Sequence, residues 1–386
     1  MRRLRLAMVV LLAAAVAAAG CTGGEETPTQ GTASQAAAAD RLNLRGVCPD
    51  PIVLQTDWFP EAEEGVYYNL IGPGYKVDQA KKRVRGPLVA EGKDTGVQIE
   101  VRSGGPAIGF EPATAQLYTD DSSTLALVNT DESVRFSAKQ PTLALVAHME
   151  ISPFAIMWDP QTYPQFKIIA DIGQTDTKVF YFQGDTYMDY LIGSGILRRS
   201  QVDGSYEGDP ATFVAAQGKV ASSIFATQEP YVYEHELPEW GKPVKYALIH
   251  DTGYQFYSQT LSIRAADKQK LAPCLKKLVP IVQRSQVEFI KSPDKTNQLI
   301  VDVVKQFKSE WQFSPGLAKY STDTMRQGFV NNGPDNTLGN FDMARVQRII
   351  DIVTPIFIAQ RQPPRANLKP EDIATNEFID PSIGVS

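Results

Sequence analysis

Short apolar runs alternate with helix-like patterns along most of the chain. The runs at 52–54, 124–128 and 142–147 are apolar almost throughout, which is typical of strands buried on both faces of a sheet. Further strands are predicted at 97–101, 154–158, 178–182, 220–226, 246–250 and 259–263. Strands of this kind, separated by helical segments, indicate an α/β fold.

Helices are predicted between the strands where apolar residues recur at intervals of three or four. They cover 186–197, 209–217, a segment from Lys268 onward, 296–307 and 342–353. Pro280 lies inside the third of these helices and is expected to kink or break it. The order of the elements predicts a mostly parallel sheet in each lobe of the fold.

The N-terminus has the pattern of a secretory leader. A basic start precedes an apolar run at 6–19, whose 14 residues fall short of the roughly 20 needed to span a bilayer. Residues 18–21 resemble a bacterial lipobox, although Ala18 stands where leucine is usual. We therefore predict a lipoprotein signal peptide at 1–20 and a diacylglycerol anchor on Cys21. The alternative is an ordinary secretory signal in which Cys21 has no role.

The next segment, 21–45, is predicted to be a flexible tether. It is rich in Gly, Thr, Ser, Gln and Ala, so it cannot bury enough apolar surface to fold.

The remaining length indicates two lobes or domains. Loss of the leader's three arginines would change the formal net charge from −6 to −9. Nucleic acid is not an expected partner, because phosphate contacts need clustered basic residues, and the short basic run at 81–85 is predicted to be a solvated surface segment.

Cys48 and Cys274 are the two cysteines that follow Cys21. Outside the cytoplasm an even pair is a disulfide candidate. We therefore predict a bond that connects the segment before the first strand to the start of a late helix. Two free buried thiols are the alternative.

Recognisable catalytic motifs are missing from the sequence. It has no G-x-S-x-G elbow and no phosphate-cradling Walker sequence. Ser292 and Lys295 fit S-x-x-K formally, but they lie between two predicted helices. His148, His235 and His250 are far apart and lack metal-ligand spacing. We therefore predict no cofactor, no metal site and no enzymatic activity.

Several short motifs occur in a fixed order along the chain. Asp-Trp-Phe-Pro at 57–60 follows the first predicted strand, and Glu-Pro-Tyr at 229–231 follows a later one. The other segments are 64–68, 96–106, 127–132, 152–156 and 217–220. Together they resemble the solute-binding proteins that include the nitrate, sulfonate and taurine binders and the thiamine-pyrimidine-precursor (THI-type) binders. Ala221 departs from this pattern, because the family usually has aspartate there.

The resemblance implies a two-lobed periplasmic-binding-protein type II fold with two crossover strands. Lobe 1 is expected at 46–150 and 255–360, lobe 2 at 151–254, and a surface tail at 361–386. The protein would be a monomer outside the cytoplasm, held at the cell membrane by its lipid, and its closure over a small ligand would signal an ABC permease. The alternatives are a non-transport sensor lipoprotein and a pyrimidine-synthase-like enzyme, although that enzyme's cysteine-rich iron motif has no counterpart in this sequence.

The candidate ligand-binding residues follow predicted strands, begin predicted helices or lie near the return crossover, and the ends of strands are where open sheets bind ligands. They are Asp57, Trp58, Tyr67, Tyr68, Asn129, Asp131, Glu132, Thr186, Tyr187, Glu229, Tyr231, Tyr254 and Tyr257. Trp58 is the predicted stacking platform, with a core tryptophan as the alternative. Asp57 is expected to accept from an amino group or to cap a helix. The residues at 129–132 are expected to face the ligand or to form a polar turn, and the first amides of the helix at Thr186 to hold a ligand oxygen.

Aromatic side chains together with several acids favour a planar nitrogen heterocycle, neutral or cationic. A thiamine-pyrimidine precursor or another vitamin-like compound fits this description. A nitrate, sulfonate or taurine site should instead offer hydroxyls, amides or arginine, because carboxylates repel an anion. We therefore predict a heterocycle and keep the anion as the alternative.

Overall fold

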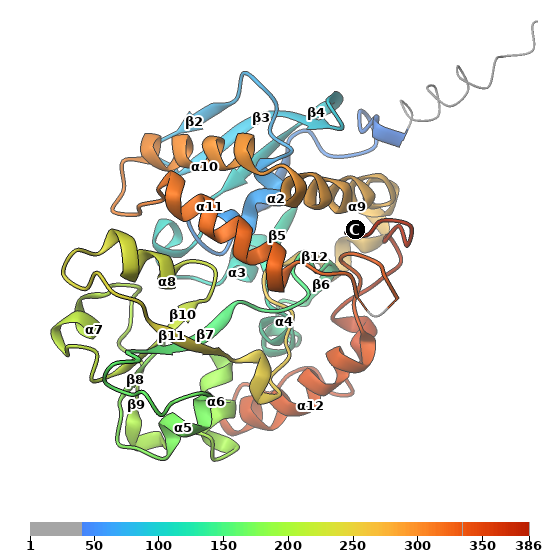
Figure 1. Cartoon of the computed structure of the whole chain (residues 1–386). Coiled ribbons are helices and arrows are strands. Elements are labelled where there is room, and N and C mark those ends of the chain that lie inside the picture. The colour runs from blue at the N-terminus through green and yellow to red at the C-terminus, as the bar shows by residue number, and fades with distance from the viewer. Residues whose placement is uncertain (1–40, 334, 386) are drawn as a thin grey trace, which may run out of the picture. The chain divides into compact units, whose positions relative to one another are not determined.

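The computed structural model describes residues 41–333 and 335–385, which belong to one compact unit, Arg41–Ser386 (Figure 1). The predicted signal peptide, the anchor at Cys21 and most of the tether lie outside the described residues. Among the helices of the described part, none combines the length and apolar character that crossing a membrane requires.

The larger sheet has seven strands in the order β2-β3-β4-β1-β5-β12-β6. The strands are β1 Ile52–Gln55, β2 Lys76–Asp78, β3 Arg83–Ala90, β4 Lys93–Arg102, β5 Leu125–Val128, β6 Thr142–Val146 and β12 Thr260–Arg264. β1 runs parallel to both β4 and β5. β12 returns from the other sheet and runs antiparallel to β5 and β6.

The smaller sheet has five strands in the order β11-β7-β10-β8-β9. They are β7 Phe154–Trp158, β8 Val179–Phe180, β9 Val202–Asp203, β10 Ala221–Phe225 and β11 Lys245–Leu248, the green and yellow strands of Figure 1. β7 is antiparallel to β10 and β11, whereas β8 is parallel to its neighbours. The prediction of mostly parallel sheets is therefore wrong: both sheets are mixed, because returning strands and a hairpin add antiparallel pairs.

Helices cover the sheets and connect their strands (Figure 1). The α-helical segments are α2 Gly65–Tyr68, α3 Ala113–Thr119, α4 Thr130–Phe136, α5 Ile169–Gly173, α6 Thr186–Gly193, α7 Ala211–Ala215, α8 Glu229–Tyr231, α9 Lys268–Lys291, α10 Asp294–Phe307, α11 Pro315–Thr324 and α12 Met343–Ala359. Helical turns of other types are η1 Ala62–Glu64, η2 Gly105–Ile108, η3 Arg199–Gln201, η4 Val232–Glu236, η5 His250–Thr252, η6 Ala265–Asp267, η7 Met325–Phe329 and η8 Pro370–Asp372. α9 continues through Pro280, so the predicted break is absent: the helix buries an apolar stripe in the core, which outweighs the hydrogen bond that proline removes.

The basic run at 81–85 leads into β3, where Lys81 and Arg85 are exposed, as expected of a surface segment, and Val84 is buried on the other face. The C-terminal segment differs from the expected surface tail. In the C-terminal segment Ile373, Ala374 and Phe378 are buried, and Ala374 makes a β-bridge with Ala144. These residues pack because the sheet leaves an apolar edge beside β6, which a solvated tail would expose.

Arg345 of α12 holds together the two chain segments that connect the sheets. Its side chain is buried, and it donates to the backbone carbonyls of Glu150, Gln255 and Phe256, the first from one connection and the other two from the second. Its guanidinium also lies 3.7 Å from the centre of the Tyr257 ring. Charge-assisted bonds of this kind fix the connections where the lobes meet.

Cys48 and Cys274 are joined by a disulfide across a sequence separation of 226 residues. The bond attaches the segment before β1 to α9 at the larger core cluster. A long loop of this kind constrains the unfolded chain strongly.

We therefore predict that the double substitution Cys48→Ser/Cys274→Ser lowers the free energy of unfolding by about 2–5 kcal/mol. Chemical denaturation would measure this loss. Reductant should destabilise the native protein in the same way and leave the double variant unchanged. Equal stability of the native protein with and without reductant would contradict the prediction.

Candidate ligand-binding site

Four carboxyl groups come from the segment that follows β1: Asp57, Glu61, Glu63 and Glu64, called here the Glu61 cluster. The last three side chains are at most 1% exposed, and Asp57 is partly buried. β1 is buried along its length, so the residues that follow it emerge inside the fold rather than on its surface. The chain turns there against Gly104, where a Cβ atom would lie 2.3 Å from the Thr56 carbonyl oxygen. Glycine at this position permits the close approach of the two loops.

Two glutamine amides donate to this cluster from other parts of the chain. Gln228, which follows β10, donates through Nε2 to Glu61 Oε2 at 2.8 Å and to Glu63 Oε2 at 3.1 Å. Gln259, which precedes β12, donates through Nε2 to Asp57 Oδ1 at 3.0 Å and to Glu61 Oε1 at 3.5 Å. Both oxygens of Glu61 thus face neutral amides.

The cluster lies at a direct contact between the two sheets. Gln228 and Thr227 belong to the loop after β10 of the smaller sheet, and the Thr227 hydroxyl donates to Glu63 Oε1. The Glu61 cluster belongs to the loop after β1 of the larger sheet. The ends of strands from both sheets therefore meet at these carboxyl groups.

Burial raises the pKa values of these acids. The pKa of Asp57 rises to about 7, as do those of Glu63 and Glu229, mainly because burial disfavours the charged form. Burial and the repulsion of neighbouring carboxylates raise the pKa values of Glu61 and Glu64 well above the usual range. Among the ion pairs of the described residues, none involves these five acids.

A second set of acids, called here the Asp131 group, lies close to the first. It consists of Asp131, Glu132 and Asp185. Tyr254 donates its hydroxyl to Asp131 Oδ2 at 2.7 Å, and Thr114 donates to Glu132 Oε1 at 2.5 Å. Asp185, at the start of α6, has a buried Oδ2 with no hydrogen-bond partner. Burial raises the pKa values of Glu132 and Asp185 to about 7 and also raises that of Asp131.

Electrostatic interactions link the two sets. The charge of Asp57 contributes to the raised pKa of Glu132, and the charge of Asp131 contributes to that of Asp185. Asp185 lies on the side of the smaller sheet, whereas Asp57, Asp131 and Glu132 lie on the side of the larger sheet. The acidic lining therefore extends from the loop after β1 to the first turn of α6.

Trp58 is surrounded by aromatic rings from three other segments. The centre of its ring lies 6.0 Å from that of Phe110, 5.8 Å from that of Phe182 and 6.2 Å from that of Trp311. Gly105 permits this arrangement, since a Cβ atom there would lie 2.5 Å from the indole. Trp58 thus sits beside the Glu61 cluster within an aromatic group that includes Phe182 of the smaller sheet's side.

Most of the predicted site residues come together near these acids. Asp57, Trp58, Asp131, Glu132 and Tyr254 belong to the contacts described above, and the charge of Glu229 contributes to the raised pKa of Glu61. Asn129 Oδ1 accepts from the Gln259 backbone at 2.8 Å. Thr186 and Tyr187 are buried beside Asp185, where the Tyr187 hydroxyl lies 2.6 Å from Ser223 Oγ.

Four predicted tyrosines have structural contacts instead. Tyr67 and Tyr68 are buried in the larger core cluster, next to Glu64. Tyr231 packs so closely on α11 that a Cβ atom on Gly316 would lie 2.0 Å from its hydroxyl. Tyr257 lies under Arg345, and its hydroxyl accepts from the backbone of Asp342 at 2.9 Å.

Sequence reasoning missed several residues that form the site. The Glu-Ala-Glu-Glu run at 61–64 directly follows Asp57, and this density of acids beside a buried strand is a signal that could have identified them. Gln228 and Gln259 carry no such signal, because an isolated glutamine in a loop is common. Asp185 precedes α6 at the N-cap position, yet it makes no side-chain capping bond.

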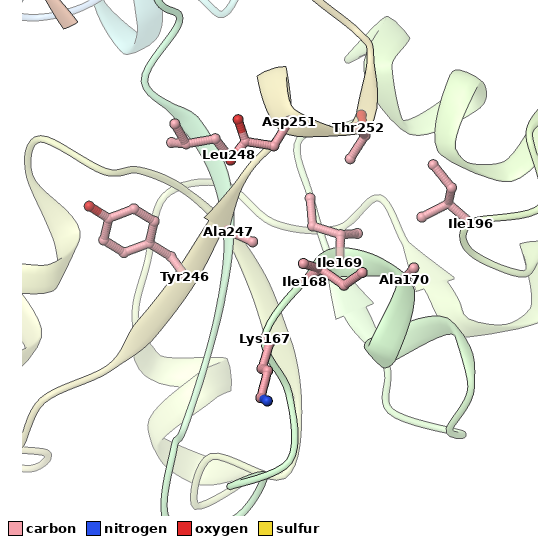
Figure 2. A pocket seen from close by; sticks show the side chains of 10 residues that line it. All are labelled: Lys167, Ile168, Ile169, Ala170, Ile196, Tyr246, Ala247, Leu248, Asp251 and Thr252. Atoms are coloured by element: carbon pink, nitrogen blue, oxygen red, sulfur yellow. The ribbon is translucent and has the colours of Figure 1, made fainter. Parts of the chain in front are cut away.

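A shallow hollow lies elsewhere, between α5 and the edge strand β11. Figure 2 shows its lining, which includes Ile168, Ile169 and Ala170 on one side and Ala247 and Leu248 on the other. It contains none of the predicted site residues. Within the described part of the chain, no group of three or more His, Cys, Asp or Glu side chains is arranged to hold a metal ion.

No protein-family model matches the sequence, and no curated protein matches it. Solved structures do match. The alkanesulfonate-binding protein SsuA of Xanthomonas axonopodis pv. citri, bound to MOPS, shares 11% identity at a TM-score of 0.52, over 85% of this chain and 99% of that one. The periplasmic aliphatic sulphonate binding protein SsuA of Escherichia coli shares 14% at 0.52, over 84% and 91%.

A Candida albicans protein with the generic periplasmic-binding-protein fold shares 11% identity at a TM-score of 0.50, over 86% of this chain and 98% of that one. At such identities the likeness concerns the fold. The chain has the two-lobed periplasmic-binding-protein fold, as the sequence motifs implied.

The buried acids predict how stability depends on pH. An unfolded carboxyl group titrates near pH 4, whereas Asp57, Glu63 and Glu229 titrate at about 7 in the fold. The folded protein holds these protons where the unfolded chain has lost them, so their stabilising contribution is lost as the pH rises from about 4 to about 7. We expect the unfolding midpoint of the ligand-free protein to fall across this range in calorimetry.

Glu63→Gln should reduce this fall, because it removes one of the titrating groups. Glu239→Gln, which changes an exposed glutamate, is the matched control and should leave the pH profile unaltered. A midpoint that stays constant or rises between about pH 5 and pH 7 would contradict the assignment.

Proposed function

We propose that the chain is an extracytoplasmic solute-binding protein of an ABC importer. It captures a small ligand between its lobes and delivers it to a permease. The observation that carries the proposal is the convergence of Trp58, Asp57 and Gln228 from the strand ends of two sheets. Ligand sites in two-sheet α/β folds are built from such strand ends, with apolar rings for area and a few polar groups for orientation.

The ligand that best fits these side chains is a planar nitrogen heterocycle. Trp58 offers an aromatic face, and Asp57 and Glu61 offer acceptors for ring or exocyclic N–H groups. The Gln259 Oε1 atom, which has no hydrogen-bond partner, is a further acceptor for an N–H group. A thiamine-pyrimidine precursor or another vitamin-like ring has this combination of groups.

A sulfonate ligand is the second candidate. It is favoured by the similarity in fold to two sulfonate-binding proteins. The carboxyl groups of the Glu61 cluster oppose it above about pH 7, where Asp57 and Glu63 ionise, because ionised carboxylates repel an anion. A thermal-shift screen with nitrate, alkylsulfonates, aminopyrimidines, thiamine and riboflavin distinguishes the two. A strong shift with a sulfonate and none with the ring compounds would overturn the heterocycle.

Trp58→Ala should abolish the thermal stabilisation that the ligand produces. Removal of a central aromatic contact costs about 2 kcal/mol or more of binding free energy. Trp240→Ala is the control for the ligand-induced shift, because Trp240 packs on Phe213 on the side of the smaller sheet. An undiminished shift in Trp58→Ala would exclude the stacking role.

We also propose that Cys21 carries the lipid that keeps the protein at the cell membrane. Fatty-acid labelling in a bacterial host should mark the native chain, whereas Cys21→Ser should lose the label and enter the soluble fraction. Cys48→Ser is the control and should keep the label. Retention of the label by Cys21→Ser would exclude this anchor.

A further inference from the structure

The Glu61 cluster is built to receive positive charge. We propose that the ligand is an organic cation and that Asp57, Glu61, Glu63 and Glu64 hold its positively charged nitrogen. This inference rests on the proposed function and specifies the charge of the ligand for the same site. Aromatic and acidic side chains alone are also compatible with a neutral ring, but the hydrogen-bond partners of these four carboxyl groups favour a cation.

The first step is the geometry of acceptors around one point. Oε2 of Glu61 and Oε2 of Glu63 both lie within hydrogen-bonding distance of the same nitrogen, Gln228 Nε2, at 2.8 and 3.1 Å. The two carboxyl oxygens are thus placed to share one N–H donor. An ammonium or amidinium nitrogen that displaced the Gln228 amide would make the same two bonds and add the charge that the amide lacks.

The second step concerns atoms without partners. Both carboxyl oxygens of Glu64 are buried and make no hydrogen bond in the described structure. Gln259, which is fully buried, donates to Asp57 and Glu61 while its own Oε1 has no partner. An orphaned buried acceptor costs about 1–3 kcal/mol, and a charged one costs more. These buried oxygen atoms of Glu64 and Gln259 have no hydrogen-bond partner, so they favour a ligand that carries N–H donors.

The third step is the local balance of charge. Within the described part of the chain, no Lys or Arg forms an ion pair with the cluster. Buried carboxylates of this kind need a counter-charge or must keep their protons. The acids and phenols that interact electrostatically with the cluster are Glu132, Glu229, Tyr67 and Tyr68. None of these four groups supplies positive charge, and burial lowers the pKa of His148, the basic side chain that interacts with Glu63, to about 4.

A group of four aromatic rings lies beside the acids. Trp58, Phe110, Phe182 and Trp311 form one ring group with centroid separations of about 6 Å from Trp58. The faces of aromatic rings attract cations, most strongly for tryptophan. Ring faces and carboxylates together recognise a cation in two ways, whereas both repel a sulfonate.

The test compares probes of matched shape and different charge. Isothermal calorimetry on the purified mature protein uses aminomethylpyrimidine, its neutral hydroxymethyl counterpart and benzenesulfonate. Thiamine and riboflavin add a larger cation and a larger neutral ring. We expect binding by cationic members and binding at least about 30-fold weaker by the neutral counterpart, as for loss of one partner in a buried charge pair.

The affinity for the cation should also rise with pH up to about 7, by about tenfold per pH unit for each proton that it displaces. This second measurement needs no variant. A sulfonate would show the opposite slope, since it binds best when the acids are protonated. A flat or falling affinity for the cation would overturn the proposal.

Substitutions test whether the Glu61 cluster is responsible for the preference for a cation. Glu61→Gln/Glu63→Gln keeps the shape and one acceptor oxygen on each side chain while removing two charges, so the protein should stay folded and lose cation binding at least about 30-fold. Glu239→Gln removes an exposed charge and should bind normally. Equal binding of neutral and cationic probes would overturn the proposal that the ligand is a cation, and it would leave the proposed solute-binding function intact. Binding of no probe at all would overturn both.

Discussion

Burial of carboxyl groups without a basic partner is the constraint on which the centre of this structure depends. A carboxylate removed from water must be neutralised, paired or surrounded by donors. Here three glutamates from one turn are buried together, and amide and hydroxyl donors from distant segments reach them. These donors come from the loop after β10 and from the segment before β12. The acids therefore determine which parts of the two sheets must meet.

The fold brings these segments together through its crossovers. Arg345 binds carbonyl groups from both connections, and α12 packs on α4 of one lobe and α6 of the other. This arrangement fixes the connections while the loops after β1 and β10 carry the polar groups. The rigid part and the adaptable part of the site are thus separate, which is the usual division between a scaffold and its ligand-binding loops.

The sequence predicts the fold class better than the details of the site. Buried strands such as β5 and β6 are recognisable because every residue in them is apolar or small, and the motif around Trp58 directly follows strand β1. The hairpin of β2 and β3 escaped prediction, since Gly86 and Pro87 interrupt its pattern.

Tyr67 and Tyr257 show why individual site residues are harder to predict than strands. A tyrosine beside a strand end reaches either the cleft or the core, and only the packing of helices far along the chain, α9 and α12, decides between them.

The proposed function, in which the lobes close over a ligand, would connect closure with neutralisation of the acids. Gln228 follows β10 of the smaller sheet, and Glu61 and Glu63 follow β1 of the larger sheet, so separation of these loops would remove the amide donor and admit water. Hydration lowers the pKa of a buried carboxyl group, and an open form would therefore carry more negative charge than the closed form. A cation that entered the open form would meet ionised acids, and the lobes would then close over charge that is already balanced. Without a cation, closure would require the acids to take up protons. The protonation of this cluster would thus be linked to closure in the empty protein, with the proposed cationic ligand replacing the protons.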